Sequence, residues 1–288
     1  MKSLSRTVAV SFCLLAIASV SASAAEVFVN NRQGNDAFDG HAGEIISATR
    51  GPVRSISRGL SLCQPGDILH LANTGVPYRE PISLSGDQFR GIGPLRFVLR
   101  GHGAVLDGSQ AIPLGRWRRI NPSLWQFAPN RKGYYLLMAG GDTQLERIET
   151  PYGEQPKPQP NQWTVSNGSI FLGTDRLIEP AMLDLRIAGR TTGLTLHDVD
   201  SVVIEDLTIR HWRVDGISLH DLSRNVTLQN VTCEENGRAG IFVGGSSSAS
   251  LQNVTANKNG KYSILVRERG VIRIDNEDNI SPQPVVEE

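Results

Sequence analysis

The chain has 288 residues, of which 39% are hydrophobic and 29 are glycine. This length is sufficient for one large core and favours a single elongated domain over two globular ones. With 29 basic and 29 acidic residues the formal net charge is zero, so charge indicates no nucleic-acid partner.

The first 25 residues have the features of a secretory signal peptide. Lys2 and Arg6 precede an apolar run over residues 8–20, and residues 22–24 read Ala-Ser-Ala, as is typical of a cleavage site. The apolar run is shorter than a membrane-spanning helix requires. The sequence therefore predicts export to the periplasm, the cell surface or the medium, with no membrane span after cleavage.

Residues 26–108 are predicted to form an N-terminal cap and the first turns of a repetitive structure. Strands are expected at 26–30, 68–72, 82–84, 97–99 and 104–106. Residues 52–63 carry apolar residues on one helical face and predict an amphipathic helix that covers the open end of the repeats. Cys63 and Cys233, the two cysteines left after cleavage, are expected to be buried and unpaired.

Residues 109–180 interrupt the repetitive pattern and contain three of the four tryptophans. Short strand-like pieces at 124–127, 135–138, 163–165 and 169–172 predict a small antiparallel insertion. Its aromatic residues have two interpretations. The favoured one is that they fill the core of the insertion, and the other is that Trp117 and Trp163 form a wall that stacks on sugar rings.

Residues 181–276 contain the repeats, which we expect to resume at 184–189. Asp206, Asn230 and Asn253 occupy one equivalent position, and Gly216 and Gly240 occupy another. Apolar residues alternate with a period of two, which predicts three short strands per repeat, and such repeats stack as a parallel β-helix. The recurrent Asn is expected to bond backbone groups at a corner. Residues 277–288 are expected to be a disordered tail.

The repeats resemble those of the right-handed parallel β-helix superfamily, the pectate-lyase-like proteins, through the pattern x-V-x-I-x-N-V-x-x-x-x-N-G-x-x-G-I. This resemblance implies an all-β fold with an N-terminal capping helix and a small antiparallel insertion. It also implies an exported protein that acts on or binds a polysaccharide, with an acidic polymer as partner and a lyase-like or glycosidase-like activity. The competing class is a non-catalytic surface, carbohydrate-binding or structural β-helix protein. The oligomeric state stays open.

The strands that begin at the recurrent glycine are expected to carry the site. Alternation directs His197 and His220 outward on adjacent turns, about 5 Å apart, each followed by an aspartate. The candidate catalytic residues are Asp215, His220 and His197. The candidate substrate-binding residues are Asp221, Asp198, Arg213, Arg238, Lys261, Arg267, Trp117 and Trp163.

Three chemistries fit these residues. A polysaccharide lyase needs a base, here His220 or His197, and a cation that pairs with a uronate carboxylate. Calcium at Asp198 and Asp221 could take the place of that cation, and no other cofactor is expected. A glycoside hydrolase needs two carboxylates, and Asp215 in V-D-G-I resembles the first acid of the β-helix galacturonidases. Their paired-aspartate and Gly-His-Gly motifs are missing, which disfavours a polygalacturonase. The alternative is that both His-Asp pairs are solvated turns.

Overall fold

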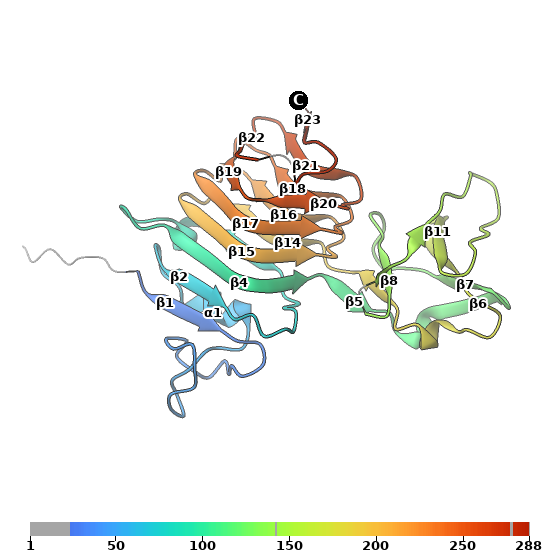
Figure 1. Ribbon diagram of the computed structural model, residues 1–288, viewed down its shortest axis with the longest axis horizontal. Helices are drawn as coiled ribbons and strands as arrows, with labels where there is room; N and C mark the ends of the chain where they lie inside the picture. The colour runs from blue at the N-terminus through green and yellow to red at the C-terminus, as the bar shows by residue number, and fades with distance from the viewer. Residues whose placement is uncertain (1–23, 142, 277–278, 288) are drawn as a thin grey trace, which may run out of the picture.

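The computed structural model describes residues 24–141, 143–276 and 279–287. The predicted signal peptide lies outside the described residues except for its last two. Two parallel sheets face each other and wind into a β-helix, and a separate lobe projects from its side (Figure 1). Among the described residues, no helix combines the length and apolar character that crossing a membrane requires.

The first sheet of the β-helix has eight strands, and all of its pairs are parallel. Its strands are β1 (Glu26–Val29), β2 (Ile68–Leu71), β4 (Phe97–Asp107), β15 (Val202–Arg210), β17 (Val226–Glu234), β19 (Ser248–Gln252), β20 (Thr255–Asn257) and β22 (Val271–Ile274). The second sheet has six strands and is also parallel throughout. Its strands are β3 (Ile82–Ser85), β14 (Thr192–His197), β16 (Asp215–His220), β18 (Ala239–Val243), β21 (Tyr262–Arg267) and β23 (Val285–Glu287).

The recurrent Asp/Asn position bends the strands of the eight-stranded sheet. Asp206, Asn230 and Asn253 have φ of 54°, 52° and 50°, in the left-handed region that Asn and Asp tolerate better than other side chains. The bend leaves the ladder on either side intact, so β15 and β17 each join two of the three predicted strands into one bent strand of nine residues. In the next repeat these two strands remain separate as β19 and β20.

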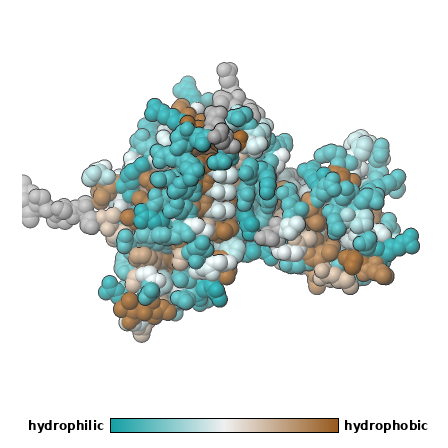
Figure 2. All heavy atoms as spheres, viewed as in Figure 1, coloured by the Kyte–Doolittle hydropathy of each residue, from teal (hydrophilic) through white to brown (hydrophobic). Residues whose placement is uncertain are grey.

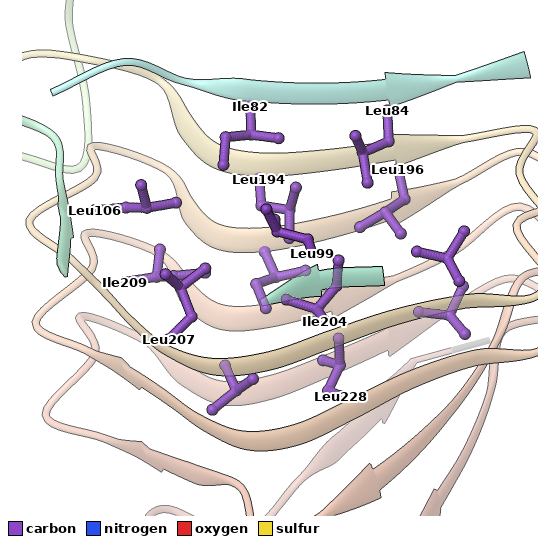
Figure 3. Packing of buried hydrophobic residues seen from close by; sticks show 14 of the residues in the cluster. Ile82, Leu84, Leu99, Leu106, Leu194, Leu196, Ile204, Leu207, Ile209 and Leu228 are labelled. Carbon is purple, nitrogen blue, oxygen red and sulfur yellow. The ribbon is translucent and has the colours of Figure 1, made fainter. Parts of the chain in front are cut away.

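The core fills the space between the two sheets. Ile217 lies in register with Ile241, and Ile241 with Ile264, and all three side chains have no exposed surface. Leu207 pairs with Val231 in the opposite sheet. Figure 3 shows aliphatic side chains from both sheets meeting in this interior. The predicted repeat register is therefore confirmed. Figure 2 shows one column of residues of intermediate hydropathy, in white, on the surface of the β-helix.

The predicted cap helix is present as α1 (Ile56–Leu62). Ser55 caps its N-terminus, and the Ser55 hydroxyl accepts a hydrogen bond from the backbone N–H of Arg58 at 3.1 Å. A Cβ at Gly59 would lie 2.6 Å from Val29 Cγ2, so only glycine allows the helix to pack this closely on β1. Cys63 and Cys233 are buried and unpaired, as expected, and burial raises the pKa of Cys63 to about 12.

The insertion forms two small sheets beside the β-helix (Figure 1). One contains β6 (Trp117–Asn121), β7 (Leu124–Phe127), β10 (Glu146–Arg147), β11 (Gln162–Ser166) and β12 (Ser169–Gly173), and the other β5 (Ser109–Ala111), β8 (Leu137–Ala139), β9 (Thr143–Gln144) and β13 (Arg186–Ala188). The part of the chain that the structure describes also has three short 3-10 helices: η1 (Gly86–Phe89), η2 (Leu114–Arg116) and η3 (Pro180–Met182).

The predicted boundary at the end of the insertion is wrong. Strand β13 pairs antiparallel with β5 and β8, and Ile187 packs into the hydrophobic cluster of the insertion. The parallel repeats resume only at β14. Residues 184–189 alternate as a β-helix strand would, and the period of two does not reveal which sheet a strand joins.

The predicted disordered tail is also wrong for its described part. The backbone of β23 pairs parallel with β21, and the Ile280 side chain is 3% exposed. The last turn of a solenoid otherwise presents unpaired strand edges and an uncovered core. The C-terminal residues cover part of that end.

Candidate functional site

The candidate site lies on the outer face of the six-stranded sheet. His197 of β14 pairs in register with His220 of β16, which confirms that the two histidines are neighbours on adjacent turns. Ser218 lies two residues before His220 and pairs with Phe242 of β18. Side chains two apart in a strand share a face, so these residues form one surface.

His197 and Asp221 form the accessible part of this surface. His197 Nε2 lies 3.4 Å from Asp221 Oδ2, and the two side chains are 51% and 69% exposed. Asp198 and Asp221 follow directly after the two strands, with φ of 50° and 40°, so each aspartate turns the chain away from the sheet. A carboxylate this close to Nε2 favours the tautomer that carries its proton there, in which Nδ1 is the nitrogen that can accept a proton.

Arg90 approaches the same end of the sheet. Its Nη2 atom lies 3.8 Å from Asp198 Oδ1 and 3.2 Å from Asp87 Oδ1. Arg90 follows η1 in a segment without repeats, so no periodicity could have placed it beside β14. Of the predicted cations, Arg267 lies at this same end of the sheet. It is the last residue of β21, as His197 and His220 are the last residues of β14 and β16.

His220 is held more firmly than His197. Its Nε2 atom lies 2.6 Å from the Ser218 hydroxyl, and its ring centroid lies 5.1 Å from that of Phe242. Ser218 itself is only 2% exposed. Packing and this hydrogen bond therefore orient His220 and leave less of its ring accessible to a ligand.

Asp215 does not open onto the surface of the histidines, contrary to the sequence-based expectation. Its side chain is 2% exposed and accepts two hydrogen bonds from Arg238, Nε to Oδ1 at 2.9 Å and Nη2 to Oδ2 at 2.6 Å. Arg238 also covers the Phe242 ring, 5.0 Å from its centroid. Burial raises the pKa of Asp215, and the hydrogen bonds from Arg238 oppose that rise.

Arg213 and Lys261 lie at the beginnings of their strands, opposite the histidine edge. Arg213 Nη1 donates to the Lys132 carbonyl at 3.2 Å, and Lys261 Nζ lies 5.5 Å from the centre of the Tyr134 ring. Both partners belong to the insertion. The structure therefore separates the predicted cations into two groups, one at each edge of the sheet.

The tryptophans do not form a substrate wall. Trp163 has no exposed surface, and its Nε1–H donates to the Leu145 carbonyl at 3.0 Å. Trp117 is 9% exposed and packs against Phe127 with ring centroids 5.4 Å apart. Both residues build the core of the insertion, which confirms the favoured interpretation of the aromatic residues.

Sequence reasoning missed a buried network around His211. His211 has no exposed surface, and its Nδ1 lies 3.3 Å from Asp107 Oδ2 and its Nε2 2.9 Å from Glu235 Oε2. Burial lowers the pKa of His211, but the hydrogen bonds to Asp107 and Glu235 outweigh it and raise that pKa overall. The three residues come from different turns, so no local motif indicated them.

The candidate metal ligands are not gathered into one cluster in the described part of the chain. No group of three or more His, Cys, Asp or Glu side chains there is arranged to hold an ion. Asp198 and Asp221, the candidate calcium ligands, lie against Arg90 and His197 instead.

Comparison with known proteins supports the architecture. A family model described as a right-handed beta helix region matches residues 164–279. A solved complex of XylC with xylose superposes with a TM-score of 0.58 at 12% identity, covering 86% of this chain and 57% of that one. The pectate lyase Pel9A gives a TM-score of 0.48 at 12% identity, covering 88% of this chain and 47% of that one.

A lacto-N-biosidase of family GH136 from Eubacterium ramulus gives a TM-score of 0.42 at 13% identity, covering 86% of this chain and 42% of its own. No curated protein sequence matches significantly. The chain thus spans between about two fifths and three fifths of the length of these three structures. At such identities the likeness concerns the fold alone. Together with the parallel turns, the family match shows that the fold of this chain is a right-handed parallel β-helix.

Proposed function

We propose that this protein is exported and binds an acidic polysaccharide on the outer face of β14, β16 and β18, where it cleaves the chain by β-elimination. The observation that carries the proposal is the pairing of an accessible histidine, His197, with the Asp221 carboxylate at 3.4 Å. The signal-peptide pattern of residues 1–25 supports export.

In the proposed reaction His197 is the general base. Its Nδ1 removes the proton alpha to the uronate carboxyl group, while Asp221 holds the opposite ring nitrogen and stabilises the imidazolium that forms. The electron pair of the broken C–H bond forms the new carbon–carbon double bond as the glycosidic C–O bond breaks. The leaving oxygen takes a proton from water, which reaches this exposed surface.

A cation must offset the charge that develops on the uronate carboxylate. We assign this role to Arg90, whose Nη2 atom contacts Asp87 and Asp198 and whose Nε atom has no hydrogen-bond partner among the described residues. Arg238 is not available, since both oxygens of the buried Asp215 already accept from it. His220 contacts Ser218 and Phe242, and these contacts fix the shape of the surface beside His197.

The test is a panel of uronate polymers incubated with the full chain, followed by ultraviolet absorbance, since elimination creates an absorbing double bond. On a polymer that the parent cleaves, His197→Gln should lower kcat by about 100-fold or more, the usual loss when a general base is removed. Its melting temperature should stay close to that of the parent, because the side chain is half exposed.

His41→Gln is the matched control, because His41 is also exposed and belongs to the N-terminal loop before α1. It should leave the rate unchanged. Full activity of His197→Gln would remove the site assignment. The second candidate function is non-catalytic glycan binding. The burial of Asp215 in an ion pair favours it, because a buried and paired Asp215 cannot act as a catalytic acid on a bound glycan. Binding of a uronate polymer without any rise in absorbance would select this second function.

A further inference from the structure

A cleft of 310 Å³ lies where the insertion meets the β-helix. A second hollow continues from it along β14, and the two share Gln110, Arg131 and Gly189. Arginines dominate the combined lining: Arg116, Arg131 and Arg213 in the cleft, and Arg131 and Arg190 in its continuation. None of the described residues that line either part is acidic.

The arginines of the cleft are held by neutral groups. Arg116 Nη2 donates to the Ala128 carbonyl and to Asn130 Oδ1, both at 2.9 Å. Arg131 Nη1 donates to the Thr191 hydroxyl at 2.9 Å, and Arg213 Nη1 donates to a backbone carbonyl. These bonds orient the guanidinium groups and leave their positive charge without a counter-ion in the lining.

The positive charges of Arg131 and Arg213 repel each other. The pKa of Arg213 is lowered, first by burial and then by the charge of Arg131. The Nε atoms of Arg190 and Arg213 and the hydroxyl of Tyr135 are buried, and none of the three has a hydrogen-bond partner among the described residues. Donors around the cleft thus exceed the acceptors that the chain supplies, an arrangement that costs free energy unless an anion is bound.

We propose that this cleft binds the anionic group of a sugar residue, a carboxylate or a sulfate ester, with Arg131 and Arg213 as its principal ligands. Guanidinium groups present paired N–H donors that match such oxyanions. The volume is at the lower end of the range for ligand sites, which fits one sugar residue better than a longer segment.

The cleft leads onto the surface proposed to act on polysaccharide. Thr195 lines the continuation and lies two residues before His197 on the same face of β14. An anionic sugar held at the insertion could therefore be followed by a chain that passes over the histidines. This inference rests on the proposed function in taking a glycan as the ligand, but it does not require that the glycan be cleaved.

The test is calorimetric titration of the full chain with galacturonic acid, galactose 6-sulfate and uncharged galactose. Binding of at least one charged sugar, weakened by added salt and absent for galactose, is the expected result. Arg131→Gln should weaken that binding at least ten-fold, and Arg131→Lys, which keeps the charge but loses the paired donors, should weaken it less. The two charged probes distinguish a carboxylate site from a sulfate site.

Arg119→Gln is the matched control, because Arg119 is an exposed arginine of the same insertion outside the cleft. It should bind as the parent does. Equal binding of galactose and the charged sugars, or unchanged binding by a folded Arg131→Gln variant, would overturn the assignment.

The two proposals fail separately. If charged sugar binds, Arg131→Gln weakens it and no polymer is cleaved, the cleft stands and the elimination reaction does not. If a polymer is cleaved through His197 while no charged monosaccharide binds and Arg131→Gln cleaves as the parent does, the cleft assignment is wrong and the reaction stands.

Discussion

Asp215 begins β16, Arg238 directly precedes the adjacent strand β18, and the two form a two-pronged ion pair with nitrogen–oxygen distances of 2.9 and 2.6 Å. The carboxylate is almost fully buried, and the guanidinium closes over it and over the Phe242 ring. This pair links two turns of the β-helix at the edge that faces the insertion. It gives the aspartate of the V-D-G-I motif a structural role.

Arg238→Ala should lower the free energy of unfolding by about 3–5 kcal/mol, because it leaves a buried carboxylate without its partner. Urea unfolding at neutral pH measures this loss. Arg119→Ala, at an exposed site, should stay within about 0.5 kcal/mol of the parent. The double variant Asp215→Ala/Arg238→Ala should be less destabilised than Arg238→Ala alone, since the unpaired charge is gone. A single variant as stable as the parent would show that the pair is not structural.

The His211 network predicts that stability depends on pH. Because the folded pKa of His211 is raised above its ordinary 6.5, its contribution is fully present below pH 6.5 and is lost as pH rises through the folded pKa. The pKa of Glu235 is lowered, first by its hydrogen bond with His211, so its contribution is present above its ordinary 4.5 and lost as pH falls. The network therefore stabilises the fold most between these two limits.

His211→Gln should remove the decline in unfolding free energy that the parent shows as pH rises above 6.5. Chemical unfolding measured at several pH values from 6 to 9 checks this prediction. His41→Gln, at an exposed histidine, should keep the decline of the parent. A parent protein whose stability rises across that range would contradict the assigned direction of the His211 shift.

The corner ladder of amides is formed by the buried Asn236 and the partly buried Asn259, which donates to the Cys233 carbonyl at 3.0 Å, and not by the Asn230 position that the repeat suggested. Asn236 Oδ1 accepts from the Trp212 backbone N–H at 3.1 Å, and its Nδ2 donates to the Ile209 carbonyl at 3.2 Å. Asn230 is exposed and donates to Asp206 Oδ1 at 2.9 Å, a side chain that water can replace.

Asn236→Ala should cost about 1–3 kcal/mol for each buried backbone group that loses its partner. Asn230→Gly is the matched comparison, since glycine keeps the left-handed backbone there and removes only the side chain. It should cost less than about 1 kcal/mol. Thermal unfolding of both variants gives the comparison, and equal melting temperatures would remove this account of the ladder.

Trp163→Ala should disrupt the insertion while sparing the β-helix, because the side chain is fully buried in the separate cluster of the insertion. The expected cost is about 3–5 kcal/mol. Limited proteolysis should cut within residues 109–188, while the far-ultraviolet signal of the parallel sheets persists. Tyr152→Ala, at a fully exposed residue, should resist proteolysis as the parent does. A resistant Trp163→Ala variant would contradict the burial argument.

The turns of the β-helix and their register could be predicted from the amino-acid sequence. Alternating apolar residues and a repeat of 23 or 24 residues leave one way to bury Ile217, Ile241 and Ile264 together, since a slip by one residue would turn each of them outward. The same period placed His197 beside His220. The alternation and the repeat length are local constraints that recur in every turn, so the amino-acid sequence alone is enough to derive them.

Which polar residues are accessible and which are paired could be learned only from the folded chain. Asp215 begins one strand of the six-stranded sheet and His197 ends another, yet Asp215 is buried under Arg238 and His197 is half exposed. The cleft joins Arg131 of the insertion to Arg213 of the repeats, and no period relates these segments. Burial and charge pairing depend on contacts between distant parts of the chain, and a pattern of neighbouring residues does not contain them.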